Sequence, residues 1–276
     1  MNNPFGFSPE EVVENTVEIR KKILTTNHNA GQGHTGADLS ETDILASLYL
    51  RLLRFSKDDP QHPDRDRFIL SKGHGVGGLY CTLAQAGLLD SNLLDTYLQF
   101  NTKLPGHPVR QKTPFVEVNT GALGHGLALG VGLALAAKKS GNGYLTYVLT
   151  GDGELQEGSN WEAAMTAAHY QLDNLIWIVD RNGLQLADCT ETIMSLEPLD
   201  DKLAAFGMSV HTTNGNDPAE FIATVESLPK DDGKPKAIIA QTTKGKGVSF
   251  IEGQPSWHHR IPKGDELPQA LEELAC

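Results

Sequence analysis

The stretch YLTYVLTGDGELQEGSNWE, residues 144 to 162, joins a strand-like apolar run to a glycine-flanked aspartate and the start of a helix. The apolar run ends at Thr150, Asp152 stands between two glycines, and SNWEAAMTAAHYQ continues with helical spacing. A second apolar run, NLIWIVD (174–180), follows this helix. Strand, helix and strand in this order form a right-handed unit with parallel strands. The sequence therefore predicts an α/β fold, with an open, mostly parallel sheet flanked by helices.

The rest of the chain extends this pattern on both sides. Downstream, residues 208–214 and 237–243 predict two further strands, with a helix between them. Upstream, residues 1 to about 110 have the pattern of helices and loops. Ser8 before Pro9 indicates an N-cap, S-E-T-D predicts a second helix from Ser40, and KGHGVGG predicts a glycine-rich loop before a third. Because no linker interrupts the pattern, we expect residues 1–276 to form a single domain whose helical N-terminal part packs on the α/β core.

Charge and cysteine content exclude several classes of function. The chain has 23 Lys and Arg against 35 Asp and Glu, a net charge of -12 that would repel a phosphate backbone, so we expect no nucleic-acid partner. Cys81, Cys189 and Cys276 lack the spacing of a disulfide framework or a zinc site. The longest apolar run, LALGVGLALAA from residue 127, is too short to span a membrane. We therefore expect a cytoplasmic protein with no membrane partner.

Two polar residues follow neighbouring strands of the predicted sheet, Asp152 after the first and Asn182 after the next. Because the carboxyl ends of parallel strands meet at one edge, with strands about 4.8 Å apart, we expect the two side chains to converge. Their oxygens, with a backbone carbonyl such as that of Leu184, suit Mg²⁺ or Ca²⁺, and Mg²⁺ usually adds water and phosphate oxygens. The pair therefore predicts a metal-bound diphosphate, which would also meet the Gly153 N–H and the N-terminus of the following helix.

Other interpretations of these glycines compete with a metal site. Gly151 and Gly153 are followed by Gln156, so a G-x-G-x-x-G dinucleotide fingerprint fails, and the chain contains no G-x-x-x-x-G-K-[ST]. Taken singly, Asp152 would be a helix cap, and Asn182 with the next glycine would be a turn. Their position after consecutive strands favours the metal site.

Glycine-preceded histidines make the pattern more specific. Four of the ten histidines directly follow a glycine, namely His34, His74, His107 and His125. Imidazoles in such loops indicate a pocket, because glycine lets backbone approach a ligand and imidazole both donates and accepts protons. GDG with an asparagine thirty residues later resembles the thiamine diphosphate signature of transketolases, 2-oxoacid dehydrogenases and decarboxylases. Together with GQGHTGADLS, LSKGHG, LPGHP, NTGALGHGLALGVGLALA and KGKGVSFIEG, it resembles, over almost the whole chain, the N-terminal, diphosphate-binding half of transketolase, and most closely the form encoded as two subunits.

This resemblance implies a thiamine diphosphate-binding (PP-type) fold, and it assigns roles by motif. The metal ligands would be Asp152, Asn182 and the Leu184 carbonyl. Other cofactor contacts would come from His34, His74, Gly121, Leu123, Gly151, Gly153, Glu154 and His258. The sugar channel would be lined by His34, His74, His107 and His258, with His34 and His258 assisting proton transfer at the acceptor aldehyde. Glu157 and Glu162 would join a buried carboxylate network across a subunit interface. The implied cofactors are thiamine diphosphate and Mg²⁺, with Ca²⁺ or Mn²⁺ as substitutes.

Several polar residues stand outside these roles. We interpret Lys244 and Lys246 in TTKGKG as solvated loop charges, and four histidines as structural or surface residues: His28, His62, His169 and His211. The chain also departs from the family pattern, with His125 for a usual glutamine, Ala37 for a common glycine and His259 for the glycine of W-H-G. His125 and His259 would reshape the pocket, so the motifs leave the sugar substrate open.

The resemblance also implies a reaction and a partner. The activity would be transfer of a two-carbon ketol unit from a ketose phosphate or related donor, including branched or sulfonated sugars, to an aldose. In the family, the glutamate that activates the cofactor lies on a pyrimidine domain, for which the chain has no matching segment before Cys276. We therefore expect a partner subunit that carries this domain, in a heterotetramer. Three alternatives stay open: an α (E1) subunit of a 2-oxoacid dehydrogenase, a non-catalytic cofactor-binding subunit, and a Mg²⁺-dependent phosphohydrolase.

Overall fold

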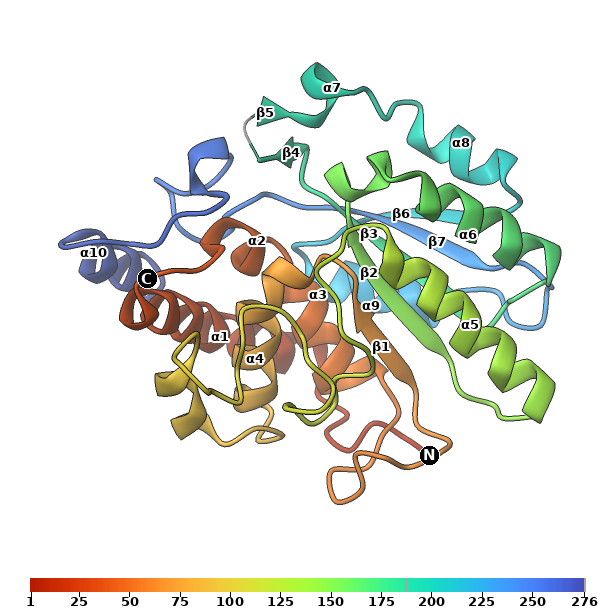
Figure 1. The fold of residues 1–276 in the computed structure, drawn as a ribbon, viewed down its shortest axis with the longest axis horizontal. Helices are drawn as coiled ribbons and strands as arrows, with labels where there is room; N and C mark the ends of the chain where they lie inside the picture. The colour runs from red at the N-terminus through yellow and green to blue at the C-terminus, as the bar shows by residue number, and fades with distance from the viewer. Residues whose placement is uncertain (187, 276) are drawn as a thin grey trace.

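The computed structural model describes residues 1–186 and 188–275, which form a sheet between two layers of helices (Figure 1). In order across the sheet, its five strands are β1 (Arg67–Leu70), β2 (Thr146–Gly151), β3 (Leu175–Arg181), β7 (Lys236–Gln241) and β6 (Ser209–Asn214). Each neighbouring pair is parallel. The predicted α/β fold with an open parallel sheet is therefore confirmed.

Strand β1 corrects the prediction for the N-terminal part, where we expected helices and loops alone. Residues 67–70 pair in parallel register with residues 146–149 of β2, which makes β1 an edge strand. The segment RFIL is only four residues long, too short for a periodic signal between helices. Its strand conformation comes from pairing with β2, a tertiary contact that local sequence does not encode.

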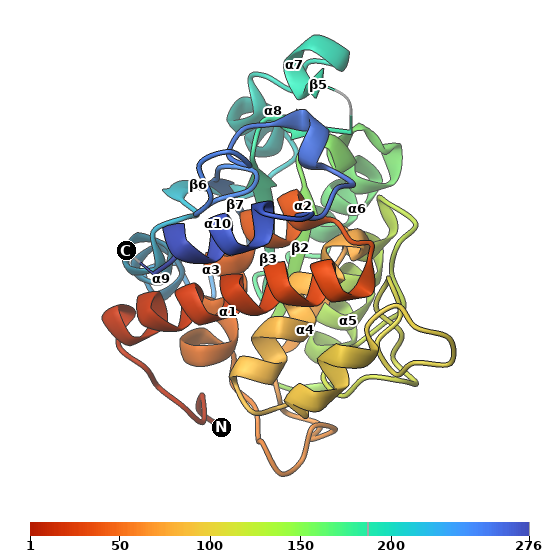
Figure 2. The same ribbon diagram turned by 90° about the vertical axis from the view of Figure 1, so that its left-hand side faces the viewer.

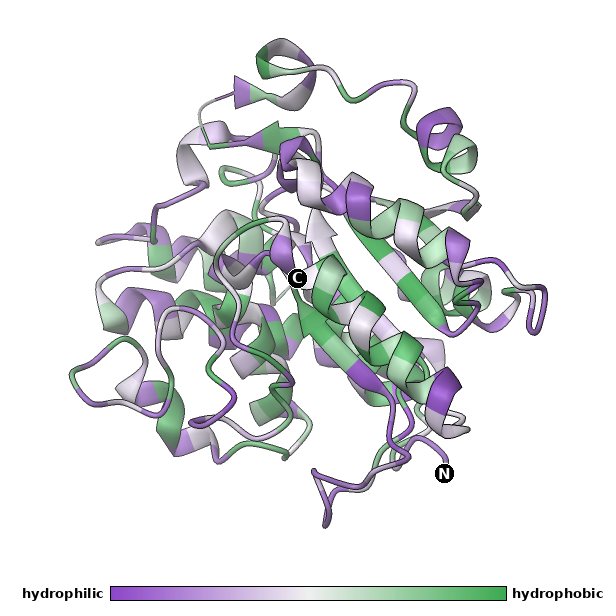
Figure 3. Ribbon diagram, turned by 45° about the vertical axis from the view of Figure 1, so that its right-hand side comes forward, coloured by the Kyte–Doolittle hydropathy of each residue, from purple (hydrophilic) through white to green (hydrophobic). Residues whose placement is uncertain are grey.

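Alternate residues of the strands face opposite helical layers, as the period of two requires. In β2, Tyr147 and Leu149 join the core under one layer, whereas Val148 joins the core under the other. The first layer contains α1 (Pro9–Ala30), α3 (Thr42–Ser47), α4 (Val76–Gln85) and α9 (Pro218–Glu226). The second contains α5 (His125–Ser140), α6 (Gly158–His169) and α8 (Leu199–Ala205). Figure 2 shows α1 and α4 on one side of the sheet, and Figure 3 shows the hydrophobic residues of β2 and α5 in green.

The first helix begins as predicted, but the second does not. Ser8 caps α1 by accepting a hydrogen bond from the Glu11 N–H at 3.3 Å, and the Glu11 carboxylate accepts from the Ser8 N–H at 2.7 Å. Ser40, however, is the last residue of α2 (Thr35–Ser40) and caps nothing, so the predicted start at Ser40 was wrong. Its hydroxyl instead donates to Asp180 Oδ1 on β3, at 2.8 Å. Ser40 therefore fastens α2 to the carboxyl edge of the sheet, and α2 begins directly after His34.

Other elements are α7 (Thr190–Ile193), α10 (Glu266–Glu273) and the antiparallel pair β4 (Leu184–Gln185) and β5 (Asp188–Cys189). The described residues also contain a π-helix, Leu48–Leu52, and 3-10 helices at Gly73–Gly75, Ser91–Thr96, Gly153–Gln156 and Pro255–Trp257. Within the described residues, none of the helices has both the length and the apolarity to cross a bilayer. Cys81 is buried, Cys189 is half-buried, and both are free thiols. Cys276 lies outside the described residues.

Candidate functional site

The residues predicted as metal ligands lie in the turns at the carboxyl ends of β2 and β3. Asp152, after β2, is 1% exposed, and its Oδ2 accepts hydrogen bonds from the Gly183 N–H at 2.6 Å and from Arg181 Nη1 at 3.1 Å. In the same turn, Asn182 Oδ1 accepts from the Leu184 N–H at 3.1 Å. The carboxylate of Asp152 therefore lies against the turn that carries Asn182 and the Leu184 carbonyl, as the strand order predicts.

Asp152 is a buried carboxylate that already has Arg181 as a cationic partner, at 3.1 Å. Burial raises the pKa of Asp152, and the nearby charge of Asp180 adds to this, while the Gly183 N–H and Arg181 oppose it. Arg181 is shared with two further carboxylates, Glu191 and Glu197, each at 2.8 Å. Within the described chain, no group of three His, Cys, Asp or Glu side chains gathers to hold a metal. A metal at Asp152 therefore needs amide, carbonyl and external oxygen ligands, the set that suits Mg²⁺.

Lys244 corrects the interpretation of a solvated loop charge. It is 3% exposed, and its Nζ donates to His258 Nδ1 at 2.8 Å and to the Leu184 carbonyl at 3.4 Å. Burial lowers the pKa of Lys244 to about 8, with Lys72 contributing. No carboxylate forms an ion pair with Lys244 among the described residues. The site thus contains a buried ammonium that lacks a contacting anion.

Four histidines from three distant segments form one cluster beside Lys244. The His34 ring lies 5.2 Å from His74, 5.7 Å from His258 and 4.6 Å from His259, measured between ring centroids. His74 and His258 are themselves 5.3 Å apart. The ring nitrogens of His34, His74 and His259 have no hydrogen-bond partner in the part of the chain that the structure describes. Of the four histidines predicted to line the sugar channel, His34, His74 and His258 lie together and His259 joins them, whereas His107 makes no ring contact with them among the described residues.

The environment holds three of these imidazoles neutral near pH 7. Burial lowers the pKa of His34 to about 4, and positive neighbours, first among them His259, add to the shift. Burial and Lys244 lower the pKa of His258 to about 3, and burial with Lys72 lowers that of His74 well below its usual value. A neutral imidazole donates one hydrogen bond and accepts another. The cluster is therefore suited to hydroxyl and carbonyl groups rather than to anions.

Two glycines bring predicted cofactor residues close to their neighbours. A Cβ on Gly121, whose φ is +130°, would lie 2.6 Å from His107 Cδ2, so the loop carrying Gly121 and Leu123 packs on the exposed His107. A Cβ on Gly153 would lie 2.7 Å from the Cβ of Gln185. Larger residues would separate these loops, so both glycines are required by close approach.

The Glu154 side chain connects loops. It is 3% exposed, and its carboxylate accepts hydrogen bonds from the Gly124 N–H at 2.9 Å, the Gly151 N–H at 3.1 Å and the Ser71 hydroxyl. Glu154 therefore holds the end of β2 against the start of α5, and its contact with the cofactor stays a prediction.

The predicted interface residues lie on the outer face of α5 and α6. Glu157, Glu162 and His125 are exposed in the chain by itself. Apolar residues share this face, with Leu129 43% and Met165 59% exposed. His125 Nδ1 contacts the Leu123 carbonyl at 3.3 Å and lies outside the histidine cluster. A carboxylate network at Glu157 and Glu162 would thus be buried only by a second chain.

A buried charge network behind the histidines was not predicted. Lys72 Nζ pairs with Asp180 Oδ2 at 2.5 Å and with Glu41 Oε2 at 2.8 Å, and the three side chains are at most 3% exposed. Burial by itself would lower the pKa of Lys72, but Asp180 and Glu41 outweigh it and raise that pKa. A Cβ on Gly75 would lie 2.7 Å from Glu41 Oε1. The glycines of KGHGVGG therefore let the segment carrying His74 lie directly on this network.

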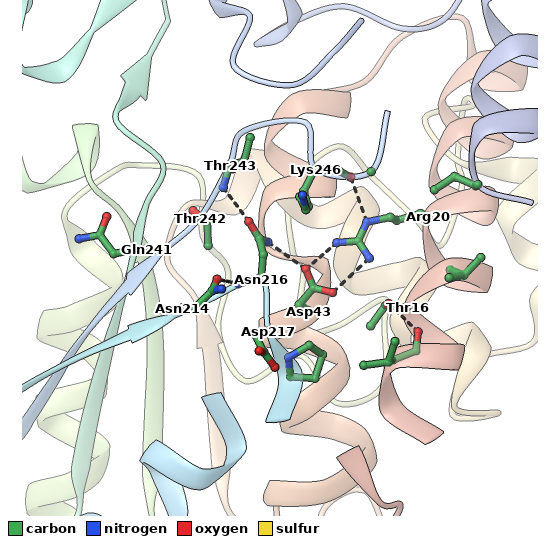
Figure 4. Close-up of a pocket in the computed structure, with 15 residues that line it drawn as sticks. Thr16, Arg20, Asp43, Asn214, Asn216, Asp217, Gln241, Thr242, Thr243 and Lys246 are labelled. Carbon is green, nitrogen blue, oxygen red and sulfur yellow. Dashed lines mark hydrogen bonds and ion pairs between the residues drawn. The ribbon is translucent and has the colours of Figure 1, made fainter. Parts of the chain in front are cut away.

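A separate hollow of about 710 Å³ lies between α1, α3 and the carboxyl ends of β6 and β7 (Figure 4). There Arg20 donates to both oxygens of Asp43 and to the Lys246 carbonyl, and Asn216 bridges Asp43 to the Thr243 N–H. These polar groups satisfy one another, so we interpret the network as a joint between helices and sheet. The histidine cluster lies outside this hollow.

Comparison with known proteins identifies the family. The family described as "Transketolase, thiamine diphosphate binding domain" matches residues 13–275. The chain belongs to the transketolase family. It is 58% identical, over 99% of both chains, to an apulose-4-phosphate transketolase subunit of Actinobacillus succinogenes. It is 42% identical, over 93% of both, to the 6-deoxy-6-sulfo-D-fructose transketolase subunit SqwG of a Clostridium species.

Solved structures agree with this assignment. The transketolase of Campylobacter jejuni superposes with a TM-score of 0.89 at 34% identity, covering 98% of this chain and 43% of that one. The predicted resemblance to the N-terminal subunit of a two-subunit transketolase and the thiamine diphosphate-binding fold are confirmed, and the chain is a transferase subunit. No comparison tests the roles assigned to single site residues, so those assignments stay predictions.

Proposed function

We propose that this chain binds thiamine diphosphate through Mg²⁺ and, with a partner subunit, transfers a two-carbon ketol unit from a ketose phosphate to an aldose. One observation carries the proposal: the buried ammonium of Lys244, without a contacting carboxylate, touches the Leu184 carbonyl beside Asp152. A buried charge is stable only when it is paired. A diphosphate bridged to Mg²⁺ would supply the missing anion, and its charge would favour the protonated lysine.

The donor set around Lys244 fits such a group. Asp152, Asn182 and the Leu184 carbonyl would hold Mg²⁺. The Gly153 N–H donates to Asp152 Oδ1 at 2.8 Å in this structure, and it would turn to phosphate oxygens when the cofactor binds. When bound, thiamine diphosphate supplies the electron sink that the cleavage of a ketose carbon–carbon bond requires. The protein's part is to hold the diphosphate at one end and to present the imidazoles at the other.

The histidine cluster fits a polyhydroxylated substrate. His34 and His74 have ring nitrogens without protein partners, and His34 contacts every other ring of the cluster. Since their pKa values lie below the physiological range, these rings are neutral and able to hydrogen-bond sugar hydroxyls and a carbonyl. We assign proton transfer at the acceptor carbonyl to His34 and His258, and His107 packs on the loop that carries Gly121.

The named relatives suggest the substrate and the partner. Two relatives named as apulose-4-phosphate transketolase subunits are 58% and 46% identical to this chain, so we propose apulose 4-phosphate as its ketose. The word subunit in these names supports a partner that carries the pyrimidine-binding domain, as does the apolar exposed face of α5 and α6. A heterotetramer of two such pairs and a cytoplasmic location stay predictions.

Isothermal titration of thiamine diphosphate with and without Mg²⁺ tests the metal assignment on the assembled enzyme. Asp152→Ala should weaken Mg²⁺-dependent binding about 100-fold or more, since a direct ligand is lost. The fold should survive, because Arg181 keeps Glu191 and Glu197 as partners. Asp64→Ala, at an exposed loop, is the matched control and should bind normally. Unchanged cofactor affinity in Asp152→Ala would remove the metal assignment.

A further inference from the structure

His259 differs from the other imidazoles of the cluster by its place at the outer side. Its ring packs on His34 at 4.6 Å, with 45° between the planes, and His259 is exposed while His34, His74 and His258 are partly covered. Among the ring contacts of the described residues, His259 touches only His34. The family pattern has glycine at this position, so this imidazole is an addition to the site.

The order of the side chains gives His259 a direction relative to the cofactor site. Lys244 lies against the Leu184 carbonyl at the metal end and against His258; His258 contacts His34, and His34 contacts His259. His259 is exposed, whereas His34, His74 and His258 are partly covered, so a substrate that extends outward from the metal end would meet His259 after the other rings.

The segment that carries His259 is held from both sides. Trp257 is 2% exposed, and its carbonyl packs so closely on α2 that a Cβ on Gly36 would lie 2.7 Å from it. On the other side of His259, His28 Nδ1 donates to the Pro262 carbonyl at 2.9 Å, which ties the segment to the end of α1. The His259 ring is thus presented from an anchored loop, which lowers the entropic cost of using it for binding.

The ring nitrogens of His259 have no hydrogen-bond partner in residues 1–186 and 188–275. An imidazole that has one face packed on His34 and its polar edge unpaired is able to bind a hydroxyl group of a ligand. We propose that His259 is a specificity residue, which hydrogen-bonds a sugar hydroxyl beyond those within reach of His34. This inference rests on the proposed function and adds that His259 makes the site selective for the outer end of a phosphorylated ketose.

The test compares ketose phosphates with analogues that each lack one outer hydroxyl, using the assembled two-subunit enzyme. For one analogue, the kcat/KM of the wild-type enzyme should be about tenfold lower than for the parent ketose, because the missing hydroxyl leaves a polar group of the site unpaired. His259→Gly should turn over this analogue and its parent equally, and His259→Asn should keep part of the difference. His62→Asn, in the loop before β1 at the opposite end of the sheet, should behave as wild type. A His259→Gly enzyme that still prefers the parent ketose over this analogue by about tenfold, or a wild-type enzyme that prefers the parent over none of the analogues, would overturn the proposal.

A binding measurement separates this inference from the proposed function. Carbon-13 labelling of the histidines, with His259→Asn used to assign its signal, reports contact without turnover. Addition of the ketose phosphate should shift the His259 signal of the cofactor-loaded complex and leave that of His62 in place. If the wild-type complex turns over no ketose, the proposed function fails, whereas an unshifted His259 signal in a complex that binds the sugar overturns the specificity role alone.

Discussion

Replacing Lys72 by methionine would remove the cation that pairs with Asp180 and Glu41 in the buried network behind the histidines. In the structure this ammonium contacts Asp180 Oδ2 at 2.5 Å and Glu41 Oε2 at 2.8 Å. Asp180 would keep the hydroxyls of Ser40 and Thr242 as donors. Glu41 would keep no hydrogen-bond donor among the described residues, since its buried oxygens have no other partner there. The variant therefore leaves the buried Glu41 carboxylate without a partner and removes one of the partners of Asp180.

The size of the effect follows from this geometry. Removing one member of a buried ion pair costs about 3–5 kcal/mol in unfolding free energy. At roughly 2.1 cal/mol/K of unfolding entropy per residue, 276 residues give about 0.6 kcal/mol/K, so Tm should fall by about 5–9 °C. Lys21→Met is the matched surface control, because Lys21 pairs with Glu18 at 2.8 Å on an exposed helix face. That change should alter stability by less than about 1 kcal/mol.

The loss should also depend on pH. Burial would raise the pKa of Asp180, but Lys72 and the hydroxyl donors outweigh it and hold that pKa below its ordinary value. In the wild type, Asp180 therefore contributes stability that is present at neutral pH and is lost only as pH falls through its lowered pKa. Without Lys72 this carboxylate resists ionisation, so the variant should be most destabilised at pH 8 and less so at pH 5.

Thermal and urea unfolding at both pH values would measure these differences, and Glu41→Gln combined with Lys72→Met should recover part of the loss. A Lys72→Met protein as stable as wild type, or a deficit that does not change between pH 5 and pH 8, would refute the reasoning.

Two further predictions concern packing and protonation. Gly75→Ala places a Cβ 2.7 Å from Glu41 Oε1 and should cost about 1–3 kcal/mol in urea unfolding, whereas Gly132→Ala, which meets nothing within 4 Å, should be neutral or stabilising; equal effects would contradict the packing argument. Because the pKa values of His34 and His258 are lowered to about 4 and about 3, the unfolded chain binds more protons below the ordinary histidine value, so stability should fall as pH drops from about 6.5 to 4. His258→Gln should reduce this slope in Tm against pH, and an unchanged slope would argue against a buried neutral ring.

The sheet was largely predictable because most of its strands are apolar runs that can be recognised in the sequence. The apolar runs that end before Asp152 and Asn182 match β2 and β3 within two residues at each end. The convergence of the two side chains then follows from parallel pairing alone. Strand β1 was missed because four residues are too few to show a periodic pattern. Ser40 was wrongly predicted to be a helix cap, because its hydroxyl donates to Asp180 on the distant strand β3 rather than capping the helix that follows it.

The site was harder to predict wherever burial decides the role. TTKGKG has the composition of a solvated loop, yet Lys244 is covered by segments that approach it only in the folded chain. Lys72 likewise reads as a loop charge until Glu41 and Asp180 surround it. The glycines before His34 and His74 predicted loops, whereas the structure has His34 as the N-cap of α2 and His74 within a 3-10 turn, Gly73–Gly75. Nothing local shows that His259 packs on His34.

The central claim is that this chain provides the diphosphate half of a transketolase site and needs a second chain to turn over. The most direct measurement is the rate of ketol transfer from apulose 4-phosphate by this subunit, by its proposed partner, and by the two combined, each with thiamine diphosphate and Mg²⁺. We predict turnover only in the mixture, with activity saturating at an equal ratio of the two chains. Full turnover by this chain alone, or none in a mixture that forms a complex and binds the cofactor, would contradict the account.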